Sequence, residues 1–350
     1  MSQDIDTKAA ISNAFRITSK RGKTCVRIRV PGGHILGRHL DVVRQIAETF
    51  GDGSVHITTR QGFEIPGIGF DKMDEVNRML RTLIEAHEVA LGVAVENLDH
   101  GYPSAGTRNV AACIGNRVCT YANYDTTAMA RRIEQAVFPN HYHVKIACTG
   151  CPNDCIKAHL QDFGIIGQAD VEMDADRCIG CEACAKNCTK RVTGAISVRH
   201  MRAYRDSRRC VGCGECALVC PTGAWSRRAT KYFRLIILGR TGKRNPRLAA
   251  TFLEWVDEDA IIQVIRNTYG FIDKHIDRSL PKEHLGYIVD RMGYQAFKED
   301  ALRGITLGKK ARVAETLDFA GYRYDCLGGL EPAGERGPTQ RDAKTHGKPA

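Results

Sequence analysis

Two short runs of the sequence each carry four cysteines at one spacing, C-x2-C-x2-C-x3-C. The runs are CIGCEACAKNC, with Cys178, Cys181, Cys184 and Cys188, and CVGCGECALVCP, with Cys210, Cys213, Cys216 and Cys220. Three thiolates on such a turn converge on one 4Fe–4S cluster, and the fourth ligates the cluster of the other run. The spacing therefore predicts one cluster on Cys178, Cys181, Cys184 and Cys220, and a second on Cys210, Cys213, Cys216 and Cys188.

The two runs favour iron over zinc, because zinc sites rarely repeat this spacing. Gly180, Gly212 and Gly214 stand between the cysteines, where the backbone must fold closely around sulfur. Thr189 follows the first run, where bacterial ferredoxins usually have proline, and this difference leaves the number of ligands unchanged. Such clusters carry single electrons and break no bonds, so another part of the chain is expected to use the electrons.

A second group of cysteines precedes these runs. It consists of Cys113 and Cys119 in ACIGNRVC, spaced C-x5-C, and Cys151 and Cys155 in TGCPNDC, spaced C-x3-C. Four thiolates in two pairs suffice for a third 4Fe–4S cluster. Using Cys148 would change the second spacing to C-x2-C, so we expect Cys148 to be a buried thiol beside the cluster.

The paired C-x5-C and C-x3-C motifs resemble those of the siroheme-dependent sulfite and nitrite reductase family. Four further stretches are similar to that family: TTRQGFEI (58–65), TRNVAAC (107–113), DFGIIG (162–167) and GRTGKRNPRLA (239–249). The resemblance implies an α+β fold, with a ferredoxin-like α/β sandwich and an α/β haem-binding domain. It also implies that the four thiolates bind a cluster and that Cys155 additionally ligates the siroheme iron.

The resemblance further implies roles for several basic residues. Arg60, Arg108, Lys145 and His143 are expected to face the substrate, with His143 replacing the lysine that the family usually has. Arg240, Lys243, Arg244 and Arg247 are expected to contact the carboxylates of siroheme. Arginine suits both tasks, because its planar guanidinium donates two parallel hydrogen bonds to an oxyanion. The alternatives are solvated strand-end charges and a solvated basic loop.

Composition narrows the class of protein. Lys and Arg total 51 and Asp and Glu total 40, which gives a net charge of +11. Long Lys/Arg runs are absent and aromatic residues are only 7%, so nucleic-acid binding is disfavoured. The sequence has neither an N-terminal signal pattern nor an apolar run of roughly 20 residues, the length of a membrane span. Clustered cysteines without such a signal predict a cytoplasmic metalloprotein.

Hydrophobic patterns outline the elements that position these residues. Strands are expected at 25–30, 55–60, 143–148 and 232–239, and helices at 39–50, 71–86, 127–137 and 258–276. We predict a ferredoxin-like half-domain (1–100), a haem and cluster domain (101–173 and 225–330), an inserted two-cluster ferredoxin domain (174–224) and a disordered tail (331–350).

These features predict a catalytic subunit that reduces sulfite to hydrogen sulfide with six electrons, using siroheme and three 4Fe–4S clusters. The alternatives are a siroheme nitrite reductase that forms ammonia and a haem-free polyferredoxin. An absorption spectrum distinguishes the polyferredoxin from the two reductases, because it would lack the bands of siroheme. GDGSVH (51–56) is no dinucleotide fingerprint, since it is too short and precedes a strand. We therefore expect flavin-containing and ferredoxin-type electron-donor subunits as partners. The resemblance also implies that the chain holds one of the two similar halves of single-chain siroheme reductases. A homologous partner or a second copy, which would make a homo-oligomer, is therefore expected to complete the assembly.

Overall fold

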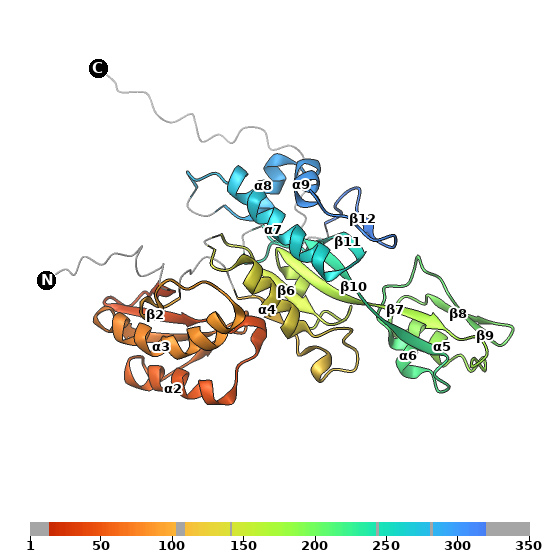
Figure 1. The fold of residues 1–350 in the computed structure, drawn as a ribbon, viewed down its shortest axis with the longest axis horizontal. Coiled ribbons are helices and arrows are strands. Elements are labelled where there is room, and N and C mark those ends of the chain that lie inside the picture. Colours follow the sequence, from red (N-terminus) through yellow and green to blue (C-terminus); the bar gives the residue numbers. More distant parts are fainter. Residues whose placement is uncertain (1–13, 103–108, 141, 243–244, 281–282, 320–350) are drawn as a thin grey trace, which may run out of the picture.

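Three units follow one another across the molecule in the computed structural model, which describes residues 14–102, 109–140, 142–242, 245–280 and 283–319. Figure 1 shows an N-terminal unit, a central sheet covered by helices, and an arm that extends from the sheet on the far side. Within the described ranges, the structure contains no helix with the length and apolar character of a membrane span.

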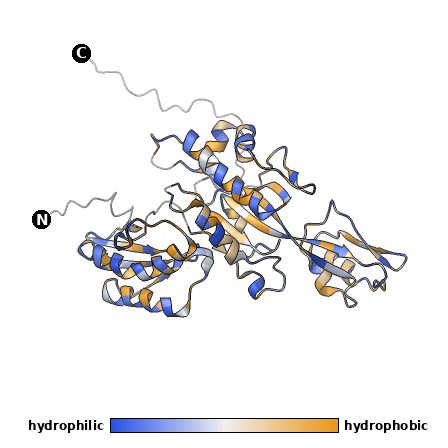
Figure 2. Cartoon of the chain, in the orientation of Figure 1, coloured by the Kyte–Doolittle hydropathy of each residue, from blue (hydrophilic) through white to orange (hydrophobic). Residues whose placement is uncertain are grey.

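The N-terminal unit is a four-stranded antiparallel sheet with two helices on one face. Its strands are β1 (Phe15–Ile17), β2 (Lys23–Ile28), β3 (His56–Ile57) and β4 (Phe63–Gly69), in the order β1-β2-β4-β3. The helices α2 (Leu40–Thr49) and α3 (Met73–His87) bury Ile46, Leu80 and Leu83 against this sheet. Their residues alternate between hydrophobic and hydrophilic in Figure 2, as amphipathic helices do.

The strand predicted at 55–60 is wrong beyond Ile57. The chain turns sharply after β3, because the Thr58 hydroxyl accepts hydrogen bonds from the backbone nitrogens of Arg60 (3.3 Å) and Gly62 (3.1 Å). Gln61 occupies the left-handed region at φ +63°. Hydrogen bonds of this kind from Ser, Thr, Asn or Asp side chains compete with strand pairing. The turn leads into β4, a strand that was not predicted.

The central sheet has six strands in the order β12-β11-β10-β7-β6-β5. The strands β5 (Ala111–Ala112), β6 (Ile146–Thr149) and β7 (Phe163–Met173) are parallel, and β10 (Trp225–Ile237), β11 (Ala250–Val256) and β12 (Arg312–Val313) add antiparallel neighbours. The helices α4 (Thr126–Val137), α7 (Glu258–His275), α8 (Leu285–Met292) and α9 (Tyr294–Ala301) share its main hydrophobic core. Asp125 and Asp257 cap the first residues of α4 and α7.

The arm is a two-stranded ribbon that ends in a small unit. Strands β7 and β10 pair from Phe163 opposite Ile237 to Met173 opposite Trp225, and residues 174–224 lie between those last partners. These residues form α5 (Ala183–Arg191), the hairpin β8 (Ile196–Arg199) and β9 (Arg202–Arg205), and α6 (Glu215–Val219). The core of this unit consists largely of alanines and cysteines around Trp225.

A buried ion-pair network joins the N-terminal unit to the central unit. Arg29, which follows β2, lies 3.0 Å from Glu88 and also pairs with Glu134 of α4. Arg29 is 4% exposed, and both carboxylates are fully buried. Burial raises the pKa of Glu88 to about 7 and raises that of Glu134, while the charge of Arg29 lowers both. The Arg29 guanidinium also stacks 3.9 Å from the Phe138 ring.

Replacing this arginine is expected to destabilise the protein strongly. Arg29→Met leaves two buried carboxyl groups without their cation, which should lower the free energy of unfolding by about 3–5 kcal/mol. Without the cation, the folded-state pKa values of Glu88 and Glu134 should rise further above their unfolded values. The variant should therefore lose more stability at pH 8 than at pH 5, where both carboxyls can bind protons.

Urea unfolding at the two pH values measures this effect. Arg44→Met is the control, because Arg44 is 56% exposed and pairs with Glu48 at the surface, where such a pair contributes about 1 kcal/mol or less. Equal midpoints for the two variants would contradict a structural role for the buried network.

Candidate functional site

The cysteines of the arm line two separate cavities. One cavity is bordered by Cys178, Cys181, Cys184 and Cys220. The other is bordered by Cys188, Cys210, Cys213 and Cys216. The structure thus groups the cysteines in the crossed sets that their spacing predicts, with the last cysteine of each run facing the cavity of the other. Among the described residues, no three His, Cys, Asp or Glu side chains are arranged to hold a single metal ion.

The backbone around the second cavity follows the sulfurs closely. Gly212 and Gly214 have φ values of +73° and +74°, a region that residues with a Cβ rarely adopt. The backbone nitrogen of Ala195 donates to Cys188 Sγ at 3.2 Å. Burial raises the pKa of Cys216 to about 12, and the neighbouring charges of Cys213 and Cys210 add to the rise. A metal cluster would reverse this preference, because its positive charge favours the thiolate.

The parallel strands bring the other four cysteines to one edge of the central sheet. Cys113 follows β5, and Cys151 follows β6, which pairs with β5 through Ala112 opposite Cys148. The Gly150 nitrogen lies 3.1 Å from Cys113 Sγ. Burial raises the pKa of Cys151, and the nearby charges of Cys119, Cys155 and Cys113 raise it further. The four thiols of the predicted third cluster therefore lie close together.

Cys155 is exposed on a turn that Asp154 fixes. The Asp154 carboxylate accepts hydrogen bonds from the backbone nitrogens of Ala158 (2.6 Å) and His159 (3.2 Å) and contacts His159 Nδ1 at 2.6 Å. Asp154 itself is 9% exposed. This turn leaves Cys155 exposed, while the hydrogen bonds of Asp154 hold the flanking backbone in place. Cys148, in contrast, is completely buried on β6, as expected for a structural thiol.

A basic cavity of ≈ 550 Å³ lies between the N-terminal sheet and the central sheet. Its walls include Asn109, Gly242 and residues of β2, β4 and the 58–62 turn. Of the described residues that line it, Glu64 alone is acidic, and the positively charged ones are Arg16, Arg27, Arg29, Arg60 and Lys145. Glu64 pairs with Arg16 at 2.8 Å and Arg27 at 2.6 Å. The cavity therefore retains an excess of positive charge, which suits an anionic occupant.

Arg60 is held in the cavity wall with part of its donor capacity unused. Its Nη2 donates to Gln161 Oε1 at 3.0 Å, whereas its Nη1 is buried without a hydrogen-bond partner. Asn109 Nδ2 donates to the Arg60 carbonyl at 2.9 Å and fixes the backbone. Burial lowers the pKa of Arg60 to about 10, against the opposing effect of Asp162. Since buried donors are nearly always paired, the unpaired Nη1 group suits a hydrogen-bond acceptor at this wall of the cavity.

The side chain of Gln61 connects this turn to the cysteine edge. Gln61 Nε2 donates to the Ala112 carbonyl at 2.7 Å, and Gln61 Oε1 accepts from the Ala112 nitrogen at 2.8 Å. Ala112 directly precedes Cys113. The contact fixes Arg60 relative to the loop that carries the first cysteine.

Lys145 reaches the same cavity from the central sheet. Its Nζ donates to the Thr241 carbonyl at 2.9 Å, and its backbone nitrogen donates to Asp162 Oδ2, also at 2.9 Å. Asp162 is 4% exposed, and burial raises its pKa to about 6 although the charges of Lys145 and Arg60 lower it. A buried carboxyl group therefore lies between the two predicted substrate-facing cations.

The other predicted site residues are placed differently. His143 is absent from the cavity lining and lies against His284, with ring centroids 5.7 Å apart. Arg240 and Arg247 pair with Asp290 at 2.8 Å and 2.7 Å and do not line the cavity. Their stretch reaches the cavity through Gly242. The roles of these three residues stay predictions, as do those of Arg108, Lys243 and Arg244, which lie outside the described residues.

Several supporting residues were not assigned a role from the sequence. These are Gln61, Asn109, Asp154, Gln161 and Asp162, which support Arg60, Lys145 or Cys155 as described above. Each lies within or beside a motif already singled out. Their position next to the predicted site residues was the available signal, and their contacts depend on chain segments far away in the sequence.

Two family descriptions cover most of the chain. Residues 17–83 match the nitrite/sulfite reductase ferredoxin-like half domain, and residues 104–311 match the nitrite and sulphite reductase 4Fe-4S domain. The dissimilatory sulfite reductase I structure has a similar fold, with a TM-score of 0.60 and 18% identity over 81% of this chain and 70% of that one.

Individual relatives extend this similarity. A subunit of the anaerobic sulfite reductase of Salmonella typhimurium is 44% identical over 95% of this chain and all of its own length. The coenzyme F420-dependent sulfite reductase of Methanocaldococcus jannaschii is 31% identical over 80% of this chain and 42% of its own. On the two domain matches and the full-length similarity to the Salmonella protein, the chain belongs to the nitrite and sulfite reductase family.

Proposed function

We propose that this chain is a sulfite reductase catalytic subunit that converts sulfite to hydrogen sulfide with six electrons. The observation that carries the proposal is the basic cavity, which Arg60 and Lys145 line and which the Gln61–Ala112 contacts connect to the residue before Cys113. A chain that only relayed electrons would have no use for such a cavity. Its similarity to the Salmonella anaerobic sulfite reductase supports sulfite as the substrate.

The residues present suit siroheme, whose many carboxylates require positive charge. The cavity is basic, and Cys155 is an exposed cysteine. When bound, siroheme supplies an iron centre at which sulfur can be reduced. Cys155 would hold that iron and also belong to a 4Fe–4S cluster with Cys113, Cys119 and Cys151, so that one sulfur joins the two centres.

Cationic side chains of the cavity can stabilise the negative charge of sulfite and supply protons for its reduction. Arg60 Nη1 can donate to a sulfite oxygen, and Lys145 Nζ adds a second positive donor. Three oxygens leave as water, so protons must reach them as the S–O bonds break. Lys145 Nζ holds such protons, and the buried Asp162 carboxyl lies next to its backbone.

Electrons would reach this site through the two cysteine sets of the arm, each holding a 4Fe–4S cluster. Arg227 of β10 donates to the Gly214 carbonyl at 3.3 Å and to the Thr120 carbonyl at 3.2 Å. Thr120 follows Cys119, so the arginine bridges the loop of the second set to the site beside siroheme. The second set is therefore the inner cluster of the relay. Flavin-containing and ferredoxin-type subunits would supply the electrons, and a second copy of the chain could complete the assembly.

The whole proposal is tested on the purified, cofactor-loaded chain. We expect siroheme bands in the red part of the absorption spectrum and about thirteen iron atoms per chain, four in each cluster and one in siroheme. Reduced methyl viologen should drive sulfite reduction to hydrogen sulfide, whereas NADH should not. Faster turnover of nitrite to ammonia would identify a nitrite reductase, and iron without siroheme bands would identify a polyferredoxin.

Replacing Cys155 should separate the haem centre from the clusters of the arm. Cys155→Ser removes the proposed iron ligand, so we expect loss of siroheme absorbance and of sulfite reduction. The arm clusters use other cysteines and should retain their electron paramagnetic resonance signals. Cys148→Ser is the matched control and should keep siroheme, since Cys148 is a buried thiol outside the ligand set. Normal siroheme content and turnover in Cys155→Ser would refute the assignment.

Replacing Arg60 should weaken binding of the transition state more than binding of the cofactors. Loss of one charged hydrogen bond costs about 1.5–3 kcal/mol, which corresponds to roughly a 10- to 150-fold fall in kcat/KM for sulfite. Arg60→Ala should show this fall with unchanged siroheme and iron content. Arg44→Ala, at an exposed arginine of α2, serves as the control. Unchanged kinetics in Arg60→Ala would place the substrate elsewhere.

A further inference from the structure

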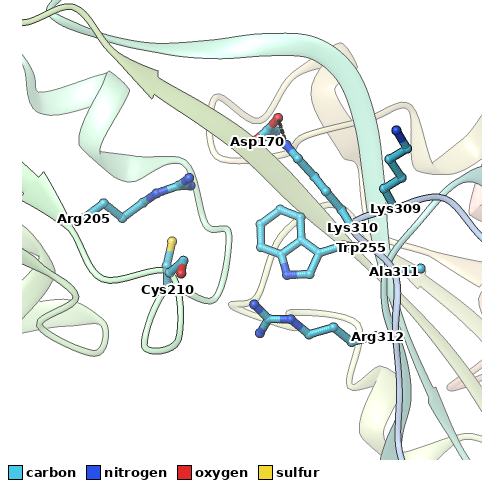
Figure 3. A pocket seen from close by; sticks show the side chains of 9 residues that line it. Asp170, Arg205, Cys210, Trp255, Lys309, Lys310, Ala311 and Arg312 are labelled. Atoms are coloured by element: carbon cyan, nitrogen blue, oxygen red, sulfur yellow. Dashed lines mark hydrogen bonds and ion pairs between the residues drawn. The ribbon is translucent and has the colours of Figure 1, made fainter.

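A second basic pocket, of ≈ 310 Å³, lies at the seam between the arm and the central sheet. Figure 3 shows Arg205 and Cys210 on one side, with Trp255 and the 309–312 segment on the other. Arg205 ends β9 and Trp255 belongs to β11, so the pocket joins two units of the molecule. Whatever binds here contacts both.

Positive charge dominates the pocket. Its lining contains Arg205, Lys309, Lys310 and Arg312, while Asp170 is its acidic member. Asp170 is already neutralised, because Lys310 contacts it at 2.5 Å and Arg228 at 3.7 Å. Lys309 and Arg312 are exposed, so their charges face the solvent at the mouth of the pocket. An arrangement of this kind attracts a negatively charged surface.

Two residues, one of them a cysteine, line both this pocket and the second cysteine cavity. Cys210 lines both, and Arg205 does so as well. The Trp255 ring packs against the same loop, since a Cβ at Gly212 would lie 3.0 Å from Trp255 Cη2. A molecule bound in the pocket would therefore share Cys210 and Arg205 with the inner cluster site.

The backbone at Trp255 is held in an unusual conformation. Its φ is +56°, a region that residues with a Cβ rarely adopt. The buried Gln168 side chain stabilises it by accepting a hydrogen bond from the Trp255 nitrogen at 2.9 Å. The indole ring lines the pocket among its cations (Figure 3) and gives it an apolar surface.

We propose that this seam pocket is the docking site of the electron-donating protein, and that the donor presents Asp and Glu side chains to it. The inference rests on the proposed function, and it has electrons enter the arm at the second cysteine set, with which the first set exchanges electrons. In each transfer, the donor's reduced flavin or iron–sulfur centre loses one electron, and the centre held by Cys188, Cys210, Cys213 and Cys216 gains it. The exposed cations of the 309–312 segment, with the half-buried Arg205 across the seam, fit an acidic protein surface better than a small anion, which binding sites usually enclose.

The test measures binding separately from catalysis. The probe is an acidic ferredoxin with two 4Fe–4S clusters, and the partner is the full, cofactor-loaded chain. Lys309→Glu/Arg312→Glu should weaken its binding by about tenfold or more at low ionic strength, and added salt should reduce this difference. Lys20→Glu/Arg21→Glu is the matched control, because it reverses one lysine and one arginine at exposed positions of the N-terminal unit.

Cross-linking locates the contact. A carbodiimide, which joins carboxylates directly to lysine amines, should link the ferredoxin to Lys309 or Lys310. No binding, equal affinity of the two double variants, or cross-links confined to other surfaces would overturn the proposal. The exposed Ile179 and Met201 in the arm mark one such alternative surface.

Dye-driven turnover distinguishes this proposal from the proposed function. Both double variants should reduce sulfite with methyl viologen as fast as the unaltered chain, because the dye needs no docking surface. Absence of dye-driven reduction in the unaltered chain would defeat the proposed function, whereas the binding and cross-linking results would still decide the docking site.

Discussion

The paired hydrogen bonds between the Gln61 amide and Ala112 fix the geometry on which the candidate site depends. They join the turn after β3 to the edge of β5. Each partner has a chemically important neighbour in the sequence. Gln61 directly follows Arg60, and Ala112 directly precedes Cys113. The contact thereby connects the Arg60 cation to the Cys113 sulfur across the two units. Arg29 fixes the same two units deeper in the structure.

Features that depend on local sequence were predictable. The cysteine sets follow from short spacings, since a turn of a few residues determines which sulfurs can converge. Helices α2, α3, α4 and α7 follow from their apolar periodicity and lie within a few residues of the predicted ranges. The strand at 55–60 was wrong beyond Ile57, because the Thr58 hydroxyl turns the chain, and β4, α8 and α9 were not predicted.

Features that depend on distant contacts were not predictable. Asp162 reads in the sequence as an ordinary acidic residue, and it becomes a buried group near Lys145 and Arg60 only when three segments come together. Arg240 and Arg247 show the opposite case. Their basic stretch resembles a carboxylate-binding loop, yet both side chains are directed to Asp290 of α8, a helix that the sequence pattern did not reveal.

The ribbon of β7 and β10 has a consequence for how such a protein can arise. The two chain ends of the 174–224 segment leave the sheet as direct neighbours, at Met173 and Trp225. The loop-closure entropy cost of a segment inserted between adjacent antiparallel strands grows only slowly with its length. The host sheet keeps its strand order whether the ribbon ends in a short hairpin or in a redox module. A reductase could therefore gain or exchange its electron-transfer module through an insertion at this hairpin, without changes to the site that receives the electrons.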